Sequence, residues 1–158
     1  MILTKIASTK KNKAKNIKNV TVAAGVLIKF NDKILLTKPA KSTKKNTWGI
    51  PKGKLEYNET YSDAAFRETK EEIGITLDKN KLIKYSEIVY KNIKTKIPYK
   101  KIYYFVYEIS SLDEIDLDSE VIPKEQLSLR EIKKAKFFTK EKALKFIFPK
   151  QIKILDHI

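Results

Sequence analysis

The stretch that decides the fold of this chain is Gly53 to Ile75, which reads GKLEYNETYSDAAFRETKEEIGI. If its second half is helical, Glu68, Glu71 and Glu72 share one face, because residues three and four apart are neighbours on a helix. Three carboxylates at one place repel each other unless a cation lies among them, so the spacing predicts a metal site. The alternative is an ordinary exposed helix whose acids form ion pairs with Lys70 and Arg67.

Signals at both ends delimit the predicted helix. Hydroxyl side chains within residues 60–62 can cap free N–H groups, and Gly74 suits the position just after a helix that ends at Ile73. Ala65 and Thr69 recur with Ile73 at four-residue spacing, which indicates a core-facing side. The pattern predicts an amphipathic helix with one acidic edge.

Two strands and a shaped loop precede the helix. Residues 20–30 and 33–37 are rich in β-branched and apolar side chains, and the polar pair at 31–32 between them is typical of a β-hairpin turn. The lysine-rich residues 38–46 predict an exposed loop. Residues 47–54 contain Gly, Pro and Gly, which exclude a regular helix and predict a loop leading into the carboxylates.

The second half of the chain adds strands and one more helix. Residues 82–90 and 102–109 are strongly β-prone, and residues 136–138 predict a further short strand. A helix is predicted over 139–147, with Thr139 as its cap and a proline after its end. This order predicts an α/β fold with a mixed sheet flanked by helices.

Composition limits the class of protein. The chain has 158 residues, of which 42% are hydrophobic, and no cysteine. This length suits one domain, expected over 19–158 after a basic, weakly structured arm at 1–18. The longest apolar run, residues 20–28, is shorter than the ~20 residues that a membrane helix needs, so we expect no membrane association. The lack of cysteine excludes disulfides and fits a cytoplasmic protein.

The formal charge of +15 has two interpretations. A positive field concentrates polyanions such as nucleotides, polyphosphates or RNA near the protein. Alternatively, abundant Lys, Ile and Asn reflect an AT-rich genome. Only two arginines occur, Arg67 and Arg130, whereas nucleic-acid contacts often use the bidentate guanidinium. Both interpretations stay open from the sequence alone.

Residues 53–75 resemble the Nudix box, the signature of hydrolases that cleave a nucleoside diphosphate linked to another moiety. Each charged and glycine position of that signature is present at its spacing: Gly53, Glu59, Arg67, Glu68, Glu71, Glu72 and Gly74. Thr69 stands where an aliphatic residue is usual. The resemblance implies a Nudix-type α/β/α sandwich, with strands before the box and a strand and helix after it.

The resemblance also implies roles for these residues. Mg²⁺, or Mn²⁺, would be bound by Glu68, Glu72 and the carbonyl of Lys52, with Glu71 as a further ligand or as the base that activates water. Such hard cations prefer oxygen ligands and can generate a nucleophile near neutral pH. In this scheme Arg67 orients a glutamate and Glu59 holds Arg67, while Gly53 and Gly74 shape the motif.

Many members of this family use one more glutamate from a later loop as a ligand or general base. Glu131 precedes the strand predicted at 136–138 and is the candidate for that catalytic role, together with Glu71 and Glu72. Glu120 and Glu125 are rivals, and all three late acids could instead be ordinary exposed loop residues. His157, the only histidine, lies in the tail and is expected to be incidental.

The residues before the box bear on the substrate. Trp48 to Lys54 resembles the sequence before the box in mRNA-decapping enzymes, and its Pro-Lys-Gly core is shared with dinucleoside tetraphosphate hydrolases. Trp48 and Lys54 are therefore candidate substrate-binding residues, although Trp48 could equally be a buried anchor and Lys54 a surface charge. Tyr103 and Tyr104 alternate across their strand, so only one of them can face the cleft and stack on a base, and Tyr104 is the candidate. The favoured substrate is a dinucleoside tetraphosphate or a 5′-capped or 5′-triphosphorylated RNA. Two alternatives are a housekeeping pyrophosphatase for damaged nucleoside triphosphates and a non-catalytic nucleotide- or RNA-binding module.

Overall fold

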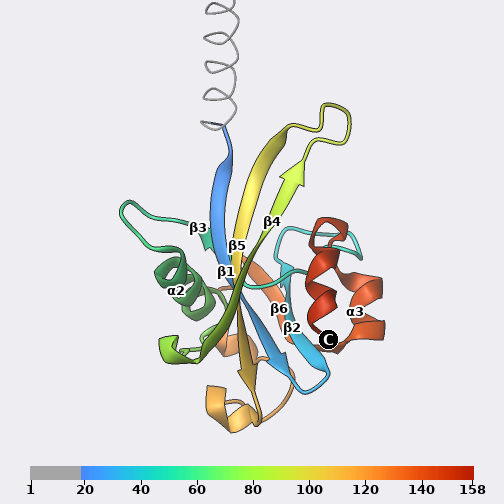
Figure 1. The fold of residues 1–158 in the computed structure, drawn as a ribbon. Helices are drawn as coiled ribbons and strands as arrows, with labels where there is room; N and C mark the ends of the chain where they lie inside the picture. The colour runs from blue at the N-terminus through green and yellow to red at the C-terminus, as the bar shows by residue number, and fades with distance from the viewer. Residues whose placement is uncertain (1–18) are drawn as a thin grey trace, which may run out of the picture.

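One mixed sheet organises the part of the chain that the structure describes. This computed structural model describes residues 19–158, apart from the side chains of Lys84 and Tyr85, so the predicted arm at 1–18 lies outside it. The sheet has six strands in the order β4-β5-β1-β2-β6, with β3 paired to β1 (Figure 1). The strands are β1 (Thr21–Phe30), β2 (Lys33–Pro39), β3 (Lys52–Lys54), β4 (Leu82–Lys91), β5 (Pro98–Ile109) and β6 (Ile132–Thr139).

Strand β1 has different neighbours on its two edges. It runs parallel to β5 along its whole length, from Thr21 beside Lys100 to Phe30 beside Ile109. On its other edge, β2 pairs only with the last two residues of β1, and β3 pairs with its first half. A Cβ atom at Gly25 would lie 2.5 Å from the carbonyl oxygen of Pro51, so only glycine permits this close approach.

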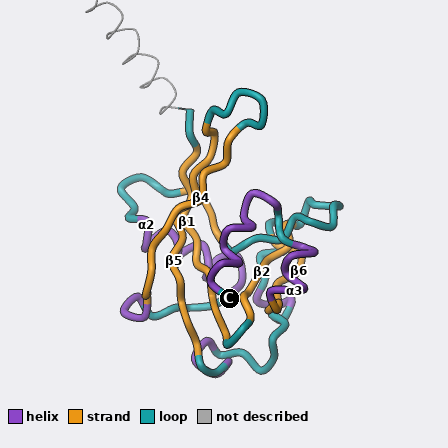
Figure 2. Tube along the Cα trace, turned by 45° about the vertical axis from the view of Figure 1, so that its right-hand side comes forward, coloured by secondary structure: helices purple, strands orange, loops and turns teal. Residues whose placement is uncertain are grey.

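Helices cover both faces of the sheet, which confirms the predicted α/β/α sandwich. Helix α2 (Tyr61–Ile73) lies on one face, and α3 (Lys140–Phe146) with the 3₁₀ helix η4 (Pro149–His157) lies on the other (Figures 1 and 2). Each face has its own apolar core, because successive side chains of β1 point to opposite sides. Val26 and Ile28 pack toward α2, whereas Leu27 packs toward α3. No helix within residues 19–158 is long and apolar enough to span a membrane.

The ends of α2 are those that the sequence predicts. Thr60 is the N-cap, and its hydroxyl accepts a hydrogen bond from the backbone N–H of Asp63 at 3.1 Å. Gly74 ends the helix with a φ of 67°, a conformation that favours glycine, and its N–H donates to the carbonyl of Lys70. Thr69 is fully buried and donates its hydroxyl to the Ala65 carbonyl, so it occupies an apolar position without an unpaired polar group.

Several boundaries differ from the sequence prediction. Residues 52–54 form strand β3 rather than only a loop, because their backbone pairs with β1, a contact that local sequence does not encode. Strand β5 begins at Pro98 instead of residue 102, and β6 begins at Ile132 instead of residue 136. Pro98 is tolerated because it is the first residue of its strand. Helix η4 was not predicted, and neither were the short 3₁₀ helices η1 (Lys79–Lys81), η2 (Leu112–Ile115) and η3 (Lys124–Gln126).

Candidate active site

Arg67 is the centre of the polar network on α2. Its Nε and Nη2 atoms donate to the two carboxylate oxygens of Glu59 at 2.7 and 2.9 Å. Nη1 donates to Glu68 at 2.8 Å and to Glu71 at 3.2 Å, and Nη2 also donates to the carbonyl of Lys54. All five donors of the guanidinium can thus be used. The hydrogen bond from Arg67 lowers the pKa of Glu59, which keeps that carboxylate charged and the loop before α2 fixed to the helix.

The absence of a side chain at Gly53 makes room for the carboxylate of Glu68. A Cβ atom built at Gly53 would overlap the carboxylate group of Glu68, so the missing side chain leaves the space in which that carboxylate lies. Glu68 is only 9% exposed, and burial is the main cause that raises its pKa. The glycine of strand β3 and the glutamate of α2 are therefore fitted to each other.

Replacing Gly53 with Ala should displace the Glu68 carboxylate. We expect a loss of stability of about 1–3 kcal/mol from overpacking, and a fall in any activity that needs Glu68 in place. The measurement is urea unfolding together with hydrolysis rates. The double variant Gly53→Ala/Glu68→Asp retracts the carboxylate by one methylene and should recover stability without recovering activity. Wild-type activity in Gly53→Ala would contradict this account of the glycine.

Glu72 is the most buried acid of the predicted set. Its side chain reaches strand β3, where Oε2 accepts a hydrogen bond from the backbone N–H of Lys52 at 3.2 Å. Burial raises the pKa of Glu72 to about 8, with the negative charges of Glu68 and Glu131 acting in the same direction. In an extended residue the N–H and C=O groups point the same way across the strand, so we expect the carbonyl of Lys52 to point toward α2 as well.

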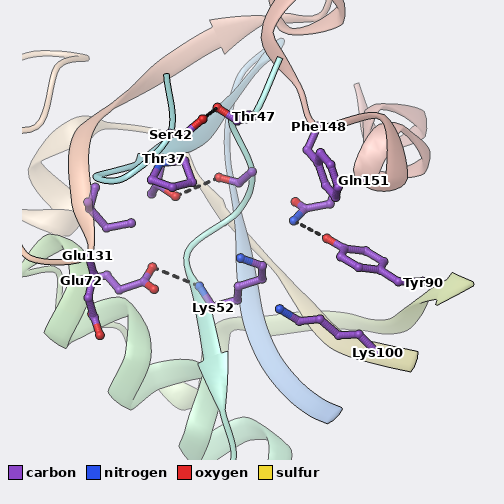
Figure 3. Close-up of a pocket in the computed structure, with 13 residues that line it drawn as sticks. Thr37, Ser42, Thr47, Lys52, Glu72, Tyr90, Lys100, Glu131, Phe148 and Gln151 are labelled. Carbon is purple, nitrogen blue, oxygen red and sulfur yellow. Dashed lines mark hydrogen bonds between the residues drawn. The ribbon is translucent and has the colours of Figure 1, made fainter. Parts of the chain in front are cut away.

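Glu72 and Glu131 open onto one cleft of about 340 Å³. Figure 3 shows these two acids on one side, Lys52 in the middle, and Lys100 with Tyr90, Gln151 and Phe148 on the opposite side. The remaining lining residues are Thr37, Pro39, Ser42, Thr47, Gly49 and Ile132. The cleft therefore brings acidic and basic groups together beside an aromatic wall.

The late glutamates occupy different places. Glu131 lies in the cleft, whereas Glu120 forms an ion pair with Lys33 at 2.6 Å and Glu125 is exposed on η3. Glu71 does not line the cleft, because Arg67 binds it; it borders a second, outer hollow that Glu131 also borders. Of the three rivals, Glu131 alone lines the cleft with Glu72.

Lys100 is a cleft residue that was not predicted from the sequence. It falls between the strands predicted at 82–90 and 102–109, but it lies in β5, half-buried in the cleft wall. Burial lowers the pKa of Lys100, and the positive charges of Lys52 and Lys54 lower it further. In a strand, the side chain of Lys100 points to the opposite face from those of Tyr99 and Lys101. This alternation is informative only once β5 is known to begin at Pro98.

None of the three predicted substrate-binding residues lines the cleft. Trp48 is 5% exposed and packs edge-on against Phe138 at a ring-centroid distance of 5.0 Å, so it is the buried anchor of the alternative interpretation. Tyr104 is 2% exposed, and its hydroxyl lies 2.9 Å from Nε2 of His157, which gives the tail histidine a packing contact. Both side chains belong to the core beneath α3 and η4. Lys54 is exposed and does not line the cleft.

The acidic groups suit a hard cation, although they do not enclose one in this conformation. Within residues 19–158, no three Asp, Glu or His groups are arranged to hold a metal ion, and Arg67 donates hydrogen bonds to Glu68 and Glu71. Glu72 nevertheless keeps a buried carboxylate close to the negative charges of Glu68 and Glu131. Such an oxygen-only donor set matches Mg²⁺ or Mn²⁺.

Comparison with known proteins assigns this architecture to a family. A family model described as "NUDIX domain" matches residues 19–158, the whole part of the chain that the structure describes. The chain belongs to the NUDIX domain family. The resemblance inferred from the box is thereby confirmed. Over 59 residues, the NUDIX chain is 46% identical to an 8-oxo-dGTP diphosphatase from Proteus vulgaris. That match covers 37% of this chain and 53% of the relative, so the NUDIX chain matches about half the length of that protein.

Solved structures show the same fold at low sequence identity. An Ap4A hydrolase of C. elegans, solved as a binary complex, is 24% identical, with a TM-score of 0.60 over 87% of the NUDIX chain and 93% of that chain. The ORF135 protein of E. coli is 21% identical, with a TM-score of 0.57 over 87% of each chain. A bifunctional NMN adenylyltransferase/ADP ribose pyrophosphatase from Francisella tularensis is 19% identical, with a TM-score of 0.61 over 87% of this chain and 40% of that one. These likenesses establish the fold.

Proposed function

We propose that this NUDIX chain is a divalent-metal-dependent hydrolase that cleaves a pyrophosphate linkage of a nucleoside polyphosphate. One observation carries the proposal: the same cleft is lined by the acids Glu72 and Glu131 and by the lysines Lys52 and Lys100. Acids alone would repel a polyphosphate, and lysines alone would bind it without supplying groups for hydrolysis. Their combination suits a metal-bound anionic substrate.

The metal would be held by oxygen atoms of α2 and β3. Glu68, Glu72 and the carbonyl of Lys52 are the proposed ligands, with Glu71 as a further ligand, and Mg²⁺ is the proposed ion with Mn²⁺ as its substitute. When bound, such an ion neutralises phosphate charge and lowers the pKa of water. Arg67 keeps Glu68 oriented toward Gly53, and Glu59 keeps Arg67 in position.

The chain's own groups supply the remaining functions. Glu131 lines the cleft and is the proposed base that takes a proton from water. Lys100 is half-buried, so its ammonium meets phosphate oxygens with less competition from water than an exposed lysine does. The aromatic wall formed by Tyr90 and Phe148 offers an apolar surface to a base or ribose.

The role of Glu131 has a matched test. Replacing Glu131 with Gln should lower kcat by about 10²-fold or more, because a positioned general base typically contributes that much. Glu125→Gln and Glu120→Gln make the same chemical change outside the cleft and should leave kcat within a factor of two of wild type, since neither side chain lines the cleft. The assay is initial rate against substrate at saturating Mg²⁺. A larger fall in either control variant would transfer the role to that residue.

The favoured substrate is a dinucleoside tetraphosphate or an RNA with a 5′ cap or 5′ triphosphate. The support is the Pro51-Lys52-Gly53 core, which resembles that of hydrolases acting on such polyphosphates, together with the lysines gathered at the cleft. A second candidate is a damaged nucleoside triphosphate. It is favoured by the local 46% identity to a protein named 8-oxo-dGTP diphosphatase.

One experiment separates these candidates. The protein is incubated with Mg²⁺ and nucleoside triphosphates, 8-oxo-dGTP, diadenosine tetraphosphate, 5′-triphosphorylated RNA and capped RNA, and the products are identified by mass. The proposal expects cleavage between phosphates, with the highest kcat/KM on a dinucleoside tetraphosphate or an RNA 5′ end. Preference for 8-oxo-dGTP would select the second candidate. No cleavage of any substrate with Mg²⁺ or Mn²⁺, together with tight RNA binding, would indicate a binding module instead.

A further inference from the structure

Strands β4 and β5 extend beyond the body of the sandwich as a projecting hairpin (Figures 1 and 2). We define the hairpin arm as residues 89–101, with its turn between Lys91 and Pro98. The sequence contains no acidic residue between Glu87 and Glu108, whereas the arm carries Lys91, Lys94, Lys96, Lys100 and Lys101. Within residues 89–101 this positive charge is therefore not offset by any acid, since Glu87 and Glu108 lie on β4 and β5 outside the arm.

Aromatic rings connect the cleft to this arm. Tyr90 lines the cleft, and its ring contacts the ring of Tyr99 edge-on, with centroids 6.1 Å apart. Tyr99 is 43% exposed and borders a separate open hollow together with Ile93 and Lys94. The two tyrosines thus form an unbroken contact from the cleft wall to the outer surface of the arm.

Lysines lie over these rings. The ammonium of Lys150, at the start of η4, is 4.9 Å from the ring centre of Tyr99 and donates a hydrogen bond to the carbonyl of Lys91 at 2.9 Å. Lys100 lies 5.7 Å from the ring centre of Tyr90. Tyr90 is only 5% exposed, so Tyr99 is the ring available for stacking on the arm. An exposed aromatic ring flanked by cations is an arrangement that proteins use for single-stranded nucleic acid, because bases stack on the ring while lysines follow the phosphates.

We propose that the hairpin arm is a binding track for single-stranded RNA whose 5′ end lies in the cleft. This inference rests on the proposed function, since it takes the cleft to hold the 5′ phosphates. The nucleotides downstream would leave past Tyr90 and Tyr99 and follow Lys94 and Lys150 along the arm. The track favours RNA over free nucleotides, because a free nucleotide ends inside the cleft and cannot reach the arm.

The chemistry of the arm distinguishes RNA from a protein partner. Ile93 is 79% exposed and Ile97 is 44% exposed, so apolar area is available for contact. An apolar protein surface placed here would bury the neighbouring lysines without partners, at a cost in desolvation. RNA satisfies both parts of the surface, since its bases contact Tyr99 and the isoleucines while its phosphates contact the lysines.

Binding of a labelled RNA tests the track. The probe is a single-stranded oligoadenylate of about 12 nucleotides with a 5′ triphosphate and a 3′ fluorophore, a length within the usual range for one single-strand site. Its Kd is measured by anisotropy in EDTA for the full chain and for Lys94→Glu/Tyr99→Ala. We expect at least about tenfold weaker binding, and a salt slope that is flatter by about one unit for the lost lysine contact.

A matched pair controls for charge and for the aromatic ring. Lys142→Glu on α3 and Tyr57→Ala on the loop before α2 make the same substitutions at exposed positions that border neither the cleft nor the arm. Lys142→Glu/Tyr57→Ala should leave the Kd within a factor of two of wild type. Equal weakening by both double variants, or no weakening by the arm variant, would overturn the track. The wild type could also bind phosphatidylserine vesicles tightly. If the arm variant, but not the control variant, weakened vesicle binding and left RNA binding unchanged, the result would overturn the track in favour of a membrane contact.

Hydrolysis of a free nucleotide separates this inference from the proposed function. Both double variants should hydrolyse the best free substrate of the wild type with unchanged kcat/KM, because neither replaces a residue that lines the cleft. RNA binding that depends on the arm in a protein without hydrolytic activity would refute the proposed hydrolase and retain the track. Hydrolytic activity together with RNA binding that the arm variant does not weaken would refute the binding track but not the proposed hydrolase.

Discussion

Glu72→Gln is expected to abolish hydrolysis while leaving the fold intact. The variant removes a carboxylate that we place among the metal ligands, and the loss of several kcal/mol of charge stabilisation corresponds to a fall in kcat of about 10³-fold or more. The glutamine oxygen can still accept the hydrogen bond from the N–H of Lys52, so the helix keeps its contact with β3. Circular dichroism should be unchanged, and initial rates at saturating Mg²⁺ measure the effect.

In the absence of metal, the same variant should be more stable than the wild type. Burial raises the pKa of folded Glu72 to about 8 from its ordinary 4.5. The stability associated with the protonated acid is therefore present below about pH 4.5 and is lost as the pH rises through 8. At about 1.4 kcal/mol per pKa unit, the loss amounts to a few kcal/mol. Urea unfolding in EDTA should show Glu72→Gln more stable than wild type at pH 9, with the difference shrinking toward pH 5. Identical pH profiles would contradict the buried charge.

Arg67→Met should be the most destabilising substitution on α2. It removes the guanidinium from Glu59 and Glu68, whose side chains are only 12% and 11% exposed, and leaves two nearly buried carboxylates without their cation. Breaking a buried pair in this way typically costs 3–5 kcal/mol, and the partial exposure of Arg67 reduces the expected loss to about 2–4 kcal/mol. Activity should fall as well, because Glu68 and Glu71 lose the group that orients them.

Arg130→Met provides the matched control. Arg130 is the only other arginine of the chain and lies exposed on the loop before β6. Its replacement should change the free energy of unfolding by less than about 0.5 kcal/mol, as is usual for surface positions. Urea unfolding at pH 7 compares the two variants. Equal losses in both would show that the network around Arg67 does not carry the stability assigned to it.

The elements with strong local signals were predictable. Thr60 and Gly74 determine the ends of α2 through capping and a left-handed φ, both of which depend on residue type. The hairpin of β1 and β2 follows from two apolar runs around Asn31 and Asp32. The acidic edge of α2 follows from the spacing of its glutamates within a stretch of 23 residues. In each case the information lies close together in the sequence.

What depends on distant contacts was not predictable. Trp48 reads as a cleft residue beside the box, but the ring of Phe138, from β6, holds it in the core. Strand alternation shows that Tyr103 and Tyr104 face opposite sides, yet not that α3 and η4 cover the side of Tyr104. Lys100 enters the cleft because β5 begins at Pro98 and pairs with the first residues of β1. Cleft walls assembled from several strands carry no local signature.

Calorimetric titration of Mg²⁺ tests the central claim most directly, namely that the acidic edge of α2 is a divalent-metal centre. The account predicts that the wild type binds Mg²⁺ at pH 7 and releases protons as it does so, because Glu72 with a pKa of about 8 must lose its proton to become a ligand. Proton release is read from titrations in buffers of different ionisation enthalpy. Glu72→Gln should bind Mg²⁺ at least tenfold more weakly and release fewer protons. Equal affinity and equal proton release in the two proteins would contradict the account.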